Sequence, residues 1–486
     1  MRMLQHILSR SETLSNSDDI GYFLDPKSVA VLGVSRQPGG WGSGIFEQVV
    51  TTGSQRRVYP INSQATEING IKAYPNMMSI PDEVELAVIA VPVQSTIEMV
   101  QQCIPKGVKA ILMVTAGFGE TPEGQDLQRQ IAEIARNNNI RIIGPNVSGI
   151  FNVSANFNAS RMVTSHIKGS PISFICQGGF AVNNVLLIGS RKGMGAGKYI
   201  HTGNECDLTC TDFLEYLGDD PSTKVILMHI EGLRDGPRFL RVAQRISKEK
   251  PIIVFKTGGT EAGARAASSH TGTLAGSDII YNAMFKQANI IRSPKMENML
   301  EFGHAFLELP PLMGNRVGII TMGGTWGVAI ADALVNKGMI VPCFSQALQE
   351  KLREAGNMPY WASTRNPIDI GAAGRSPGET GHLKLIEALL ASEEIDAVIV
   401  HGMGQIGFRT ERMPLVFRVE EETIRAAFEL IPKYNKPLMI CSQFTQDDSG
   451  VIRSLIEEGR RFYHDIEDMT TVLASLHTYY MNRENI

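Results

Sequence analysis

The sequence has no apolar run long enough to cross a membrane, and it has few cysteines. No stretch approaches the roughly 20 consecutive apolar residues that a bilayer-spanning helix needs, and the first residues lack a hydrophobic signal segment. The 6 cysteines are scattered along 486 residues, and none forms a CxxC pair. The pattern therefore predicts free thiols instead of a disulfide framework. Together these absences predict a cytoplasmic protein that does not enter a membrane.

Charge of neither sign is in large excess. The chain has 46 Lys and Arg against 50 Asp and Glu, which gives a net charge of -4, and the basic residues are dispersed. A nucleic-acid-binding protein usually gathers Lys and Arg on one face, so no nucleic-acid partner is expected. A hydrophobic content of 43% describes an ordinary globular chain. The length suggests about three domains of roughly 150 residues each.

The stretch from Thr257 to Asp278 reads TGGTEAGARAASSHTGTLAGSD and carries His270. Small residues surround this histidine, and no bulky apolar neighbour appears before Leu274, so the segment cannot form part of a core. A strand-like run precedes it and an amphipathic stretch, 278–289, follows it. The pattern predicts a long loop on an α/β scaffold, the kind of position where functional residues collect.

Several chemistries are open to a histidine in such a loop. The imidazole can attack a phosphoryl group, act as a general base or bind a metal. No second His or Cys lies at ligand spacing around His270, so no metal site is expected. The surrounding glycines and hydroxyl residues leave donors for phosphate oxygens and favour the phosphoryl role. Composition leaves open the alternative of a polar surface loop with an incidental histidine.

A glycine-rich turn opens the first domain. The apolar run 29–34 leads into Ser35, Arg36 and the string QPGGWGSG, and a helix-like segment follows. This order is typical of a doubly wound α/β unit whose turn can hold phosphate. An NAD site would need an acidic residue at the end of the next strand, about 20 residues on. That strand, 57–62, ends at Asn62, so NAD is disfavoured.

The string SSHTGTLAGSD, with GGTEAGARAA before it and YNAMFKQANIIR after it, resembles the phosphohistidine loop of the NDP-forming acyl-CoA synthetases. This superfamily includes succinyl-CoA synthetase and the ADP-forming acetate–CoA ligases, and the resemblance is to the α subunit of the second group. It implies that His270 takes a phosphoryl group from an acyl phosphate site and passes it to ADP. The resemblance runs from about Leu24 to about Tyr479.

The strand ends AVIAVP, ILMVTAGF and RIIGPN resemble the CoA-binding domain of the same family. The resemblance implies that Ser35 and Arg36 meet the CoA phosphates and that the later turns line the rest of the groove. The residues implied in CoA binding are Gly33, Ser35, Arg36, Val91, Pro92, Ala116, Gly117, Pro145 and Asn146. Without the resemblance, each of these positions is a strand end that needs a turn.

The second domain carries a turn, CQGGFA at 176–181, where relatives usually read Ser-Gln-Ser-Gly-Ala. The chain departs from that pattern at Cys176, Gly178 and Phe180. Backbone donors and the helix dipole survive these changes, whereas the hydroxyl donors and the free space do not. We therefore expect a reshaped acyl or phosphate site. Its implied residues are Gln177, Gly178, Gly179, Phe180, Gly203 and Asn204.

The resemblance also concerns two residues beside that turn. It implies that Glu231, after the strand 224–230, accepts the other ring N–H of His270, which fixes the tautomer and stabilises the charged phosphoimidazole. A strand-end carboxylate exposed to water is the alternative for Glu231. His201 departs from the family pattern, and it is either an added substrate contact or a satisfied structural histidine.

The third domain begins near Gly314 and has its own strand, glycine-rich turn and helix. The turn MGGTWG, at 322–327, departs from the Asn-Gly-Gly-Gly of relatives, and Trp326 either narrows a pocket or packs between domains. The string NPID, at 366–369, matches a family motif. The expected fold is α/β, with a CoA-binding Rossmann-like domain (20–148) followed by two flavodoxin-like domains, 149–310 with the histidine loop and 311–486.

The expected function is that of the α subunit of an ADP-forming acyl-CoA synthetase, which converts a carboxylic acid, CoA and ATP to acyl-CoA, ADP and Pi. No GxxxxGK[ST] loop is present, and an ATP-grasp module would need about two further domains. A separate ATP-grasp β subunit is therefore expected to hold ATP/ADP and Mg²⁺. The alternative is a CoA-binding regulatory protein of the same fold without ligase activity. The sequence does not identify the acid.

Overall fold

The computed structural model describes most of the chain. The described residues are 17–37, 39–52, 56–119, 122–179, 181–263, 265–266, 277–371, 380–404 and 414–483. The chain divides into two compact units, Met1–Leu186 with Gly195–Met296 and Leu187–Met194 with Glu297–Ile486. Three larger sheets and their helices make up the fold, and the expected α/β architecture is confirmed. None of the helices in the described ranges combines the length and apolar character needed to cross a bilayer.

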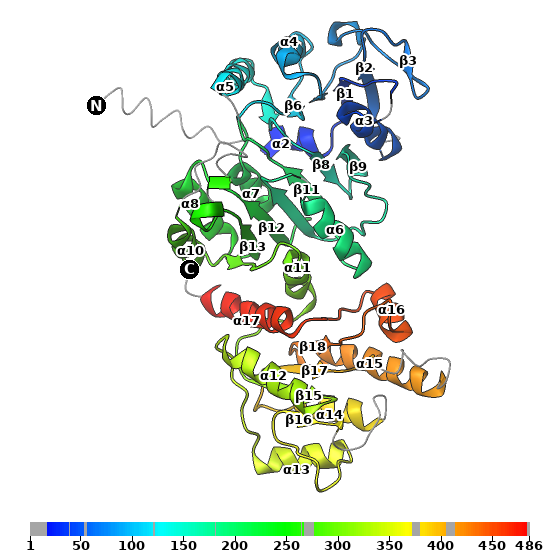
Figure 1. The fold of residues 1–486 in the computed structure, drawn as a ribbon, viewed down its shortest axis with the longest axis vertical. Coiled ribbons are helices and arrows are strands. Elements are labelled where there is room, and N and C mark those ends of the chain that lie inside the picture. Colours follow the sequence, from blue (N-terminus) through cyan, green and yellow to red (C-terminus); the bar gives the residue numbers. More distant parts are fainter. Residues whose placement is uncertain are drawn as a thin grey trace, which may run out of the picture. The chain divides into compact units, whose positions relative to one another are not determined.

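The first sheet is parallel and has the strand order β2-β1-β5-β6-β7 (Figure 1). All residues of β1, β5 and β6 are buried, which explains why their sequences are continuous apolar runs. The strand order reverses between β1 and β5, which places a ligand crevice at the carboxyl ends of these strands. The strands are β1 (Ser28–Leu32), β2 (Arg57–Ile61), β5 (Leu86–Ile89), β6 (Ala110–Met113) and β7 (Arg141–Ile143). The accompanying elements are α3 (Trp41–Thr52), β3 (Glu67–Ile68), β4 (Ile71–Lys72), η1 (Met77–Ser79), η2 (Val93–Ser95), α4 (Thr96–Cys103) and α5 (Pro122–Asn137).

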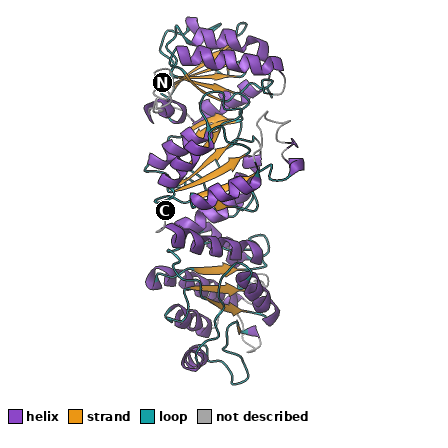
Figure 2. Cartoon of the chain, turned by 90° about the vertical axis from the view of Figure 1, so that its left-hand side faces the viewer, coloured by secondary structure: helices purple, strands orange, loops and turns teal. Residues whose placement is uncertain are grey.

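The second sheet has seven strands in the order β14-β13-β12-β10-β11-β8-β9, with helices on both faces (Figure 2). Here the order reverses between β10 and β12, so the crevice of this sheet lies where these two strands end. The strands are β8 (Gly149–Asn152), β9 (Phe157–Ser160), β10 (Ile172–Cys176), β11 (Lys198–His201), β12 (Val225–Ile230), β13 (Ile252–Lys256) and β14 (Ile291–Arg292). The helices are α6 (Ala181–Arg191), α7 (Cys210–Asp219), α8 (Gly236–Ile246) and α10 (Asp278–Gln287).

Two parts of this unit precede or flank the predicted strands. The first twenty or so residues are expected to form a loosely held helix, and most of them lie outside the described residues. The described helix α2 (Ser17–Leu24) has Ile20 and Phe23 fully buried. The hairpin β8–β9 pairs antiparallel with β11 and extends the second sheet. Its strands are only four residues long, too short for their pattern to be recognised.

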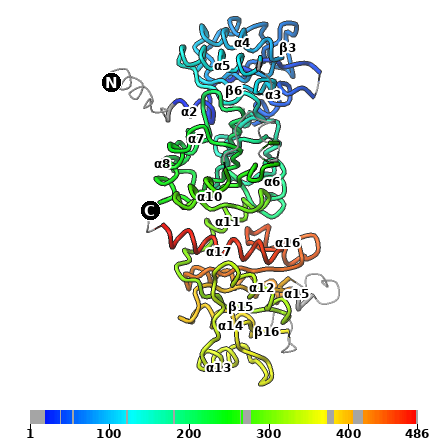
Figure 3. Tube along the Cα trace, turned by 60° about the vertical axis from the view of Figure 1, so that its left-hand side comes forward, coloured from blue at the N-terminus to red at the C-terminus, as the bar shows by residue number. Residues whose placement is uncertain are grey.

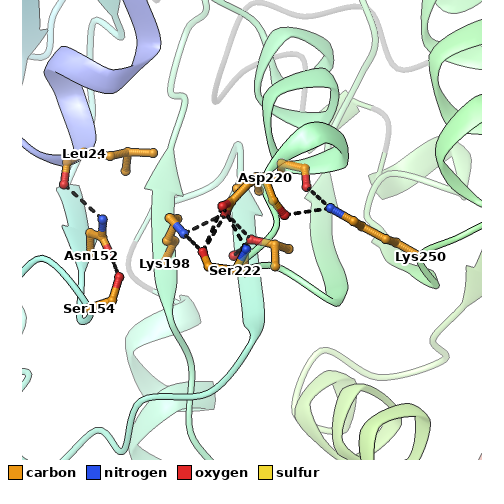
Figure 4. Close-up of polar contacts among 10 residues, drawn as sticks. Leu24, Asn152, Ser154, Lys198, Asp220, Ser222 and Lys250 are labelled. Atoms are coloured by element: carbon orange, nitrogen blue, oxygen red, sulfur yellow. Dashed lines mark hydrogen bonds and ion pairs between the residues drawn. The ribbon is translucent and has the colours of Figure 1, made fainter. Parts of the chain in front are cut away.

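A partly buried polar cluster around Lys198 closes the amino-terminal edge of the second sheet (Figure 4). The Lys198 ammonium lies 2.7 Å from the Asp220 carboxylate and 2.5 Å from the Ser222 hydroxyl. Lys250 donates to the backbone carbonyls of Leu217 and Asp220 at 2.9 and 2.7 Å. Burial alone would raise the pKa of Asp220. The hydrogen bonds that its carboxylate accepts from Lys198, Thr223 and Ser222 have the larger combined effect and lower the pKa to about 2. The cluster therefore stabilises the edge of the sheet opposite to the crevice.

The second unit contains a four-stranded parallel sheet in the order β16-β15-β17-β18, which reverses between β15 and β17. Helix α17 packs along α12, and both are traced in Figure 3. The strands are β15 (Val317–Thr321), β16 (Ile368–Asp369), β17 (Ala397–His401) and β18 (Leu438–Cys441). The helices are α11 (Met299–Glu308), α12 (Gly324–Val335), α13 (Gln346–Ala355), α14 (Thr380–Leu390), α15 (Pro414–Tyr434), α16 (Gly450–Glu457) and α17 (Ile466–Arg483).

Candidate functional site

The turn between β1 and α3 is held in one conformation by its own residues. Gly33 has a φ of 94°, and a β-carbon there would lie 2.2 Å from the carbonyl oxygen of Ala90, so only glycine fits. The Ser35 N–H donates to the Ser43 hydroxyl at 2.9 Å, and that hydroxyl donates to the Ser35 carbonyl at 3.0 Å. The side chains of Ser35 and Arg36 are exposed. The turn therefore presents a hydroxyl and a cation to solvent.

A cavity of about 390 Å³ lies at the carboxyl ends of the first sheet. It contains four of the predicted site residues, Val91, Ala116, Asn146 and Gly179, and so joins the predicted CoA groove to the turn before α6. Gly33, Ser35, Arg36, Pro92, Gly117 and Pro145 are not among its lining residues. Six further lining residues are not among the predicted site residues, and these are Trp41, Ala90, Val114, Thr115, Val147 and Ser148. Trp41 lies in the glycine-rich string QPGGWGSG, but nothing in that string assigns it to a cavity wall.

Gly203 and Asn204 lie against the Pro145 turn of the first sheet. The Asn204 N–H donates to the Pro145 carbonyl at 2.9 Å, and Gly203 packs closely on the same carbonyl. The Arg234 guanidinium donates to the Asn204 carbonyl at 2.7 Å. These contacts give the pair a structural task, which is to join the end of β11 to the predicted CoA groove.

Gln177 connects the turn after β10 to the end of β12. Its amide oxygen accepts the N–H groups of Glu231 and Gly232 at 2.6 and 3.1 Å. Its amide nitrogen donates to the Gly232 carbonyl at 2.8 Å and to Glu205 Oε1 at 2.9 Å. Burial raises the pKa of Glu205 above its ordinary value, against the opposing effect of these bonds. Gln177 therefore fixes the backbone that carries Glu231.

Glu231 reaches the same turn with its side chain. The residue is 9% exposed, so the alternative of a water-exposed strand-end carboxylate is wrong. A β-carbon on Gly178 would lie 2.5 Å from Glu231 Oε1 and 2.7 Å from His229 Cε1. A side chain larger than that of glycine is thus disfavoured at Gly178, because these two side chains occupy the space that it would fill.

His229 is a buried site residue that sequence reasoning missed. Its Nδ1 accepts the Gly178 N–H at 3.2 Å, and its Nε2 lies 3.2 Å from the Thr257 hydroxyl. Burial, and then the electrostatic influence of the nearby His201 and Lys256, lower its pKa to about 3, so the ring is neutral at physiological pH. In the sequence it is the penultimate residue of the run VILMHI, where a histidine is not distinguishable from a core residue.

His201 is satisfied within the protein. Its Nδ1 accepts the Ser148 N–H at 2.6 Å, and its Nε2 lies 2.9 Å from the Gln177 carbonyl oxygen. Both ring nitrogens are therefore engaged, which favours the structural alternative, although the ring also borders the 390 Å³ cavity.

Two predicted site residues, His270 and Phe180, lie outside the described residues. The stretch that contains His270 follows Thr257, which lies beside His229, and leads into α10. Within the described ranges, no group of three or more His, Cys, Asp or Glu residues could hold a metal ion.

Two family models match this unit. A CoA-binding domain matches residues 27–152, and a succinyl-CoA ligase-like flavodoxin domain matches residues 169–306. The first match spans the β1–α3 turn, and the second spans the Gln177 turn and Glu231.

Curated relatives and a solved structure agree with these models. The α subunit of ADP-forming acetate–CoA ligase II from Pyrococcus furiosus is 38% identical over 381 residues, covering 78% of this chain and 81% of the relative. The ADP-forming acetate–CoA ligase of Methanocaldococcus jannaschii is 41% identical over 352 residues, covering 72% of this chain but only 49% of the relative. The chain thus spans about half the length of that relative. The dinucleotide-forming acetyl-coenzyme A synthetase 1 of Ca. Korarchaeum cryptofilum, in complex with phosphate and ADP, superposes with a TM-score of 0.84 at 30% identity, covering 96% of this chain and 98% of the other.

Proposed function

This chain belongs to the family of ADP-forming acetate–CoA ligases, and from that premise we propose that it is the α subunit of an ADP-forming acyl-CoA synthetase. The reaction is carboxylic acid + CoA + ATP to acyl-CoA + ADP + Pi, and it is reversible. The observation that carries the proposal is the convergence of Gln177, Gly178 and Glu231 at the point where the strand order of the second sheet reverses. Ligands bind at such points in open α/β sheets.

The proposed mechanism divides the work among the parts of this chain. A ring nitrogen of His270 attacks the γ-phosphorus of ATP and releases ADP, and Glu231 accepts the other ring N–H. A carboxylate oxygen of the acid then takes the phosphoryl group, which gives an acyl phosphate and frees the histidine. The CoA thiol loses its proton, attacks the acyl carbon and expels Pi. The first domain holds CoA, with Ser35 and Arg36 toward its phosphates.

A second chain is part of the proposal. The sequence carries no Walker-type phosphate loop, and two of the relatives that it matches are named as α subunits. We assign ATP/ADP and Mg²⁺ to an ATP-grasp β subunit in a cytoplasmic hetero-oligomer. The domain boundaries near residues 148 and 310 remain predictions. The relatives that support the proposal are ligases, so no observation favours the regulatory alternative.

The test is a coupled assay of the chain with its ATP-grasp partner and a panel of carboxylic acids. We expect thioester formation together with one ADP for each acyl-CoA. His270→Ala should abolish it, because no other group then accepts the phosphoryl. His166→Ala is the matched control, since His166 is exposed and lies outside the site. Full activity of His270→Ala would contradict the mechanism, and CoA binding without any ligase activity would favour a regulatory protein.

A further inference from the structure

His229 lies between three segments of the candidate site. It is the penultimate residue of β12, so its side chain and that of Glu231 leave the strand on the same side. One ring nitrogen faces the Gly178 N–H, and the other faces the Thr257 hydroxyl. Gly178 belongs to the turn before α6, and Thr257 is the residue at which β13 gives way to the stretch containing His270. A single ring thus links the turn, the carboxylate strand and the start of that stretch.

The hydrogen bonds determine which tautomer the ring adopts. Since Nδ1 accepts a backbone N–H, the proton of the neutral ring is on Nε2 and points to Thr257 Oγ1. The ring also stacks on Phe255, with centroids 5.9 Å apart and planes 26° apart, and is only 4% exposed. Stacking and two directional bonds leave the imidazole a single orientation. A neutral ring so confined can position its neighbours but has no path for a proton.

The contacts of Gly178 tie His229 to the carboxylate. The ring atom Cε1 and Glu231 Oε1 both lie where a Gly178 side chain would begin, at 2.7 and 2.5 Å. Glu231 Oε1 is the end of a flexible side chain, so it can move if the space beside it opens. The ring of His229 cannot move, because Phe255 and its two hydrogen bonds fix it. The imidazole therefore limits the positions open to the Glu231 carboxylate.

We propose that His229 is a positioning residue of the ligase site, which holds the Gly178 turn, the Glu231 carboxylate and Thr257 in the arrangement that phosphoryl transfer requires. The inference rests on the proposed function, because it assigns His229 a task only if Glu231 orients the phosphorylated histidine. His229 would neither touch substrate nor exchange a proton. It accounts for glycine at position 178, where the resemblance implies serine, since the imidazole and a serine side chain cannot both fit.

The first experiment compares His229→Ala, His229→Asn and His229→Gln in the assembled complex. We expect His229→Ala to lower kcat about 10- to 100-fold, with KM for CoA unchanged, since misplacement of a reacting group has effects of that size. Asn keeps an acceptor for Gly178 and Gln keeps a donor for Thr257, so each should recover part of kcat. The pH dependence of kcat should keep its midpoint. A shifted midpoint, or no recovery by either amide, would overturn the proposal.

The second experiment uses the steric link. Gly178→Ser should lower kcat strongly because its β-carbon meets the imidazole, whereas Gly178→Ser combined with His229→Ala should be more active than Gly178→Ser alone. If His229→Ala does not fold, His229→Asn and His229→Gln, each alone and combined with Gly178→Ser, still decide the matter. Additive losses in the double variant would contradict the proposal. His304→Ala, at a buried histidine of the second unit, is the control for instability and should leave kcat unchanged.

The two proposals fail in different ways. Absence of labelled phosphohistidine in the wild-type complex given γ-labelled ATP would remove the proposed function, and with it the task of His229. Normal labelling in the wild type and equal labelling rates in all His229 variants would leave the function standing and remove only the positioning role.

Discussion

The second and third sheets each have a turn between a central strand and a helix, with a histidine at the end of the neighbouring strand. The side-chain contacts around the two turns differ. In the first unit, β10 leads through Gln177 and Gly178 into α6, and the neighbouring β12 ends near His229. In the second unit, β15 leads through a glycine turn into α12, and the neighbouring β17 ends at His401. Both turns stand where the strand order reverses, which is the position that open α/β sheets use for ligands.

The polar groups at the first turn form a connected network. Gln177 bonds to Glu205 and to the end of β12, and His229 bonds to Gly178 and Thr257. The Glu231 carboxylate lies beside Gly178 in the same turn. At the second turn the side-chain bonds are local, since the Thr321 hydroxyl accepts the Gly323 N–H at 3.2 Å and donates to the Gly323 carbonyl at 3.0 Å. The link to the neighbouring strand is a backbone bond, from the Met322 N–H to the His401 carbonyl at 3.1 Å.

The two histidines show the difference most directly. Burial lowers the pKa of both, to about 3 for His229 and about 4 for His401. His401 packs against Trp326 with ring centroids 5.1 Å apart and planes tilted by 32°, and its Nδ1 has no hydrogen-bond partner among the described residues. The sequence left two alternatives for Trp326, narrowing a pocket or packing between domains. In the structure its indole packs on His401, a residue of its own sheet. Burial is enough to keep His401 neutral. At His229 the hydrogen bonds to Gly178 and Thr257 also hold those two neighbours in place.

The largest difference should come from removing one polar side chain in each turn. Gln177→Leu leaves two backbone N–H groups and one carbonyl without their partner, which should cost about 4 kcal/mol at roughly 1 to 3 kcal/mol for each buried group. Glu205 loses one bond and keeps those from Thr202 and Cys210. Thr321→Val removes the two local bonds of one hydroxyl, both to Gly323, and should cost about 1 kcal/mol. Urea unfolding of both variants measures the free energies. Equal losses would contradict the contrast between network and local bond.

Gln177→Leu could lower kcat either by destabilising the protein or by disturbing the site. Asp220→Asn, which should destabilise the protein away from the site, distinguishes the two. The substitution leaves Lys198 buried with a weakened partner at the far edge of the same sheet, which should cost about 3 kcal/mol. The pKa of Asp220 is below its ordinary value, so its contribution is complete above about pH 4 and is lost as the pH falls toward 2. We expect a lower melting temperature but unchanged kcat at 25 °C. A kcat loss matching that of Gln177→Leu would mean that instability alone explains both.

Acid should destabilise both histidine sites to a similar extent. Each folded pKa lies below the ordinary 6.5, so the unfolded chain binds a proton that the folded chain does not, and stability falls as the pH drops from 6.5 toward 3 for His229 or 4 for His401. Between pH 7 and 5, His229→Gln and His401→Gln should each reduce the loss of unfolding free energy by about 2 kcal/mol. Unfolding curves at the two pH values measure this. An effect at only one site would show that burial is not the shared cause.

The smallest effect should follow from Trp326→Ala. Trp326 is 46% exposed, so its loss should change the unfolding free energy by about 1 kcal/mol or less. It uncovers His401, however, and the pKa of that ring should rise toward 6.5 as water reaches it. NMR titration of the imidazole protons follows the rise, with His229 as the internal reference. An unchanged His401 would mean that other groups keep water out.

The sequence predicts the strands well because parallel strands buried on both faces appear as apolar runs, as in β1, β10 and β12. The family resemblance supplies Gln177 and Glu231 as site residues. It does not supply His229, whose partners Gly178 and Thr257 lie 51 and 28 residues away along the chain. Such contacts arise only when strand ends meet at one edge of a sheet, and single-sequence patterns carry no trace of them.

The most direct test of the account is to give the assembled complex γ-labelled ATP, map the label by mass spectrometry, and then add CoA and acid. The account predicts an acid-labile, base-stable label on His270, discharged as Pi while acyl-CoA forms, and labelled far more slowly in Glu231→Gln. A label on another residue, or a label on His270 that CoA and acid do not discharge, would contradict it.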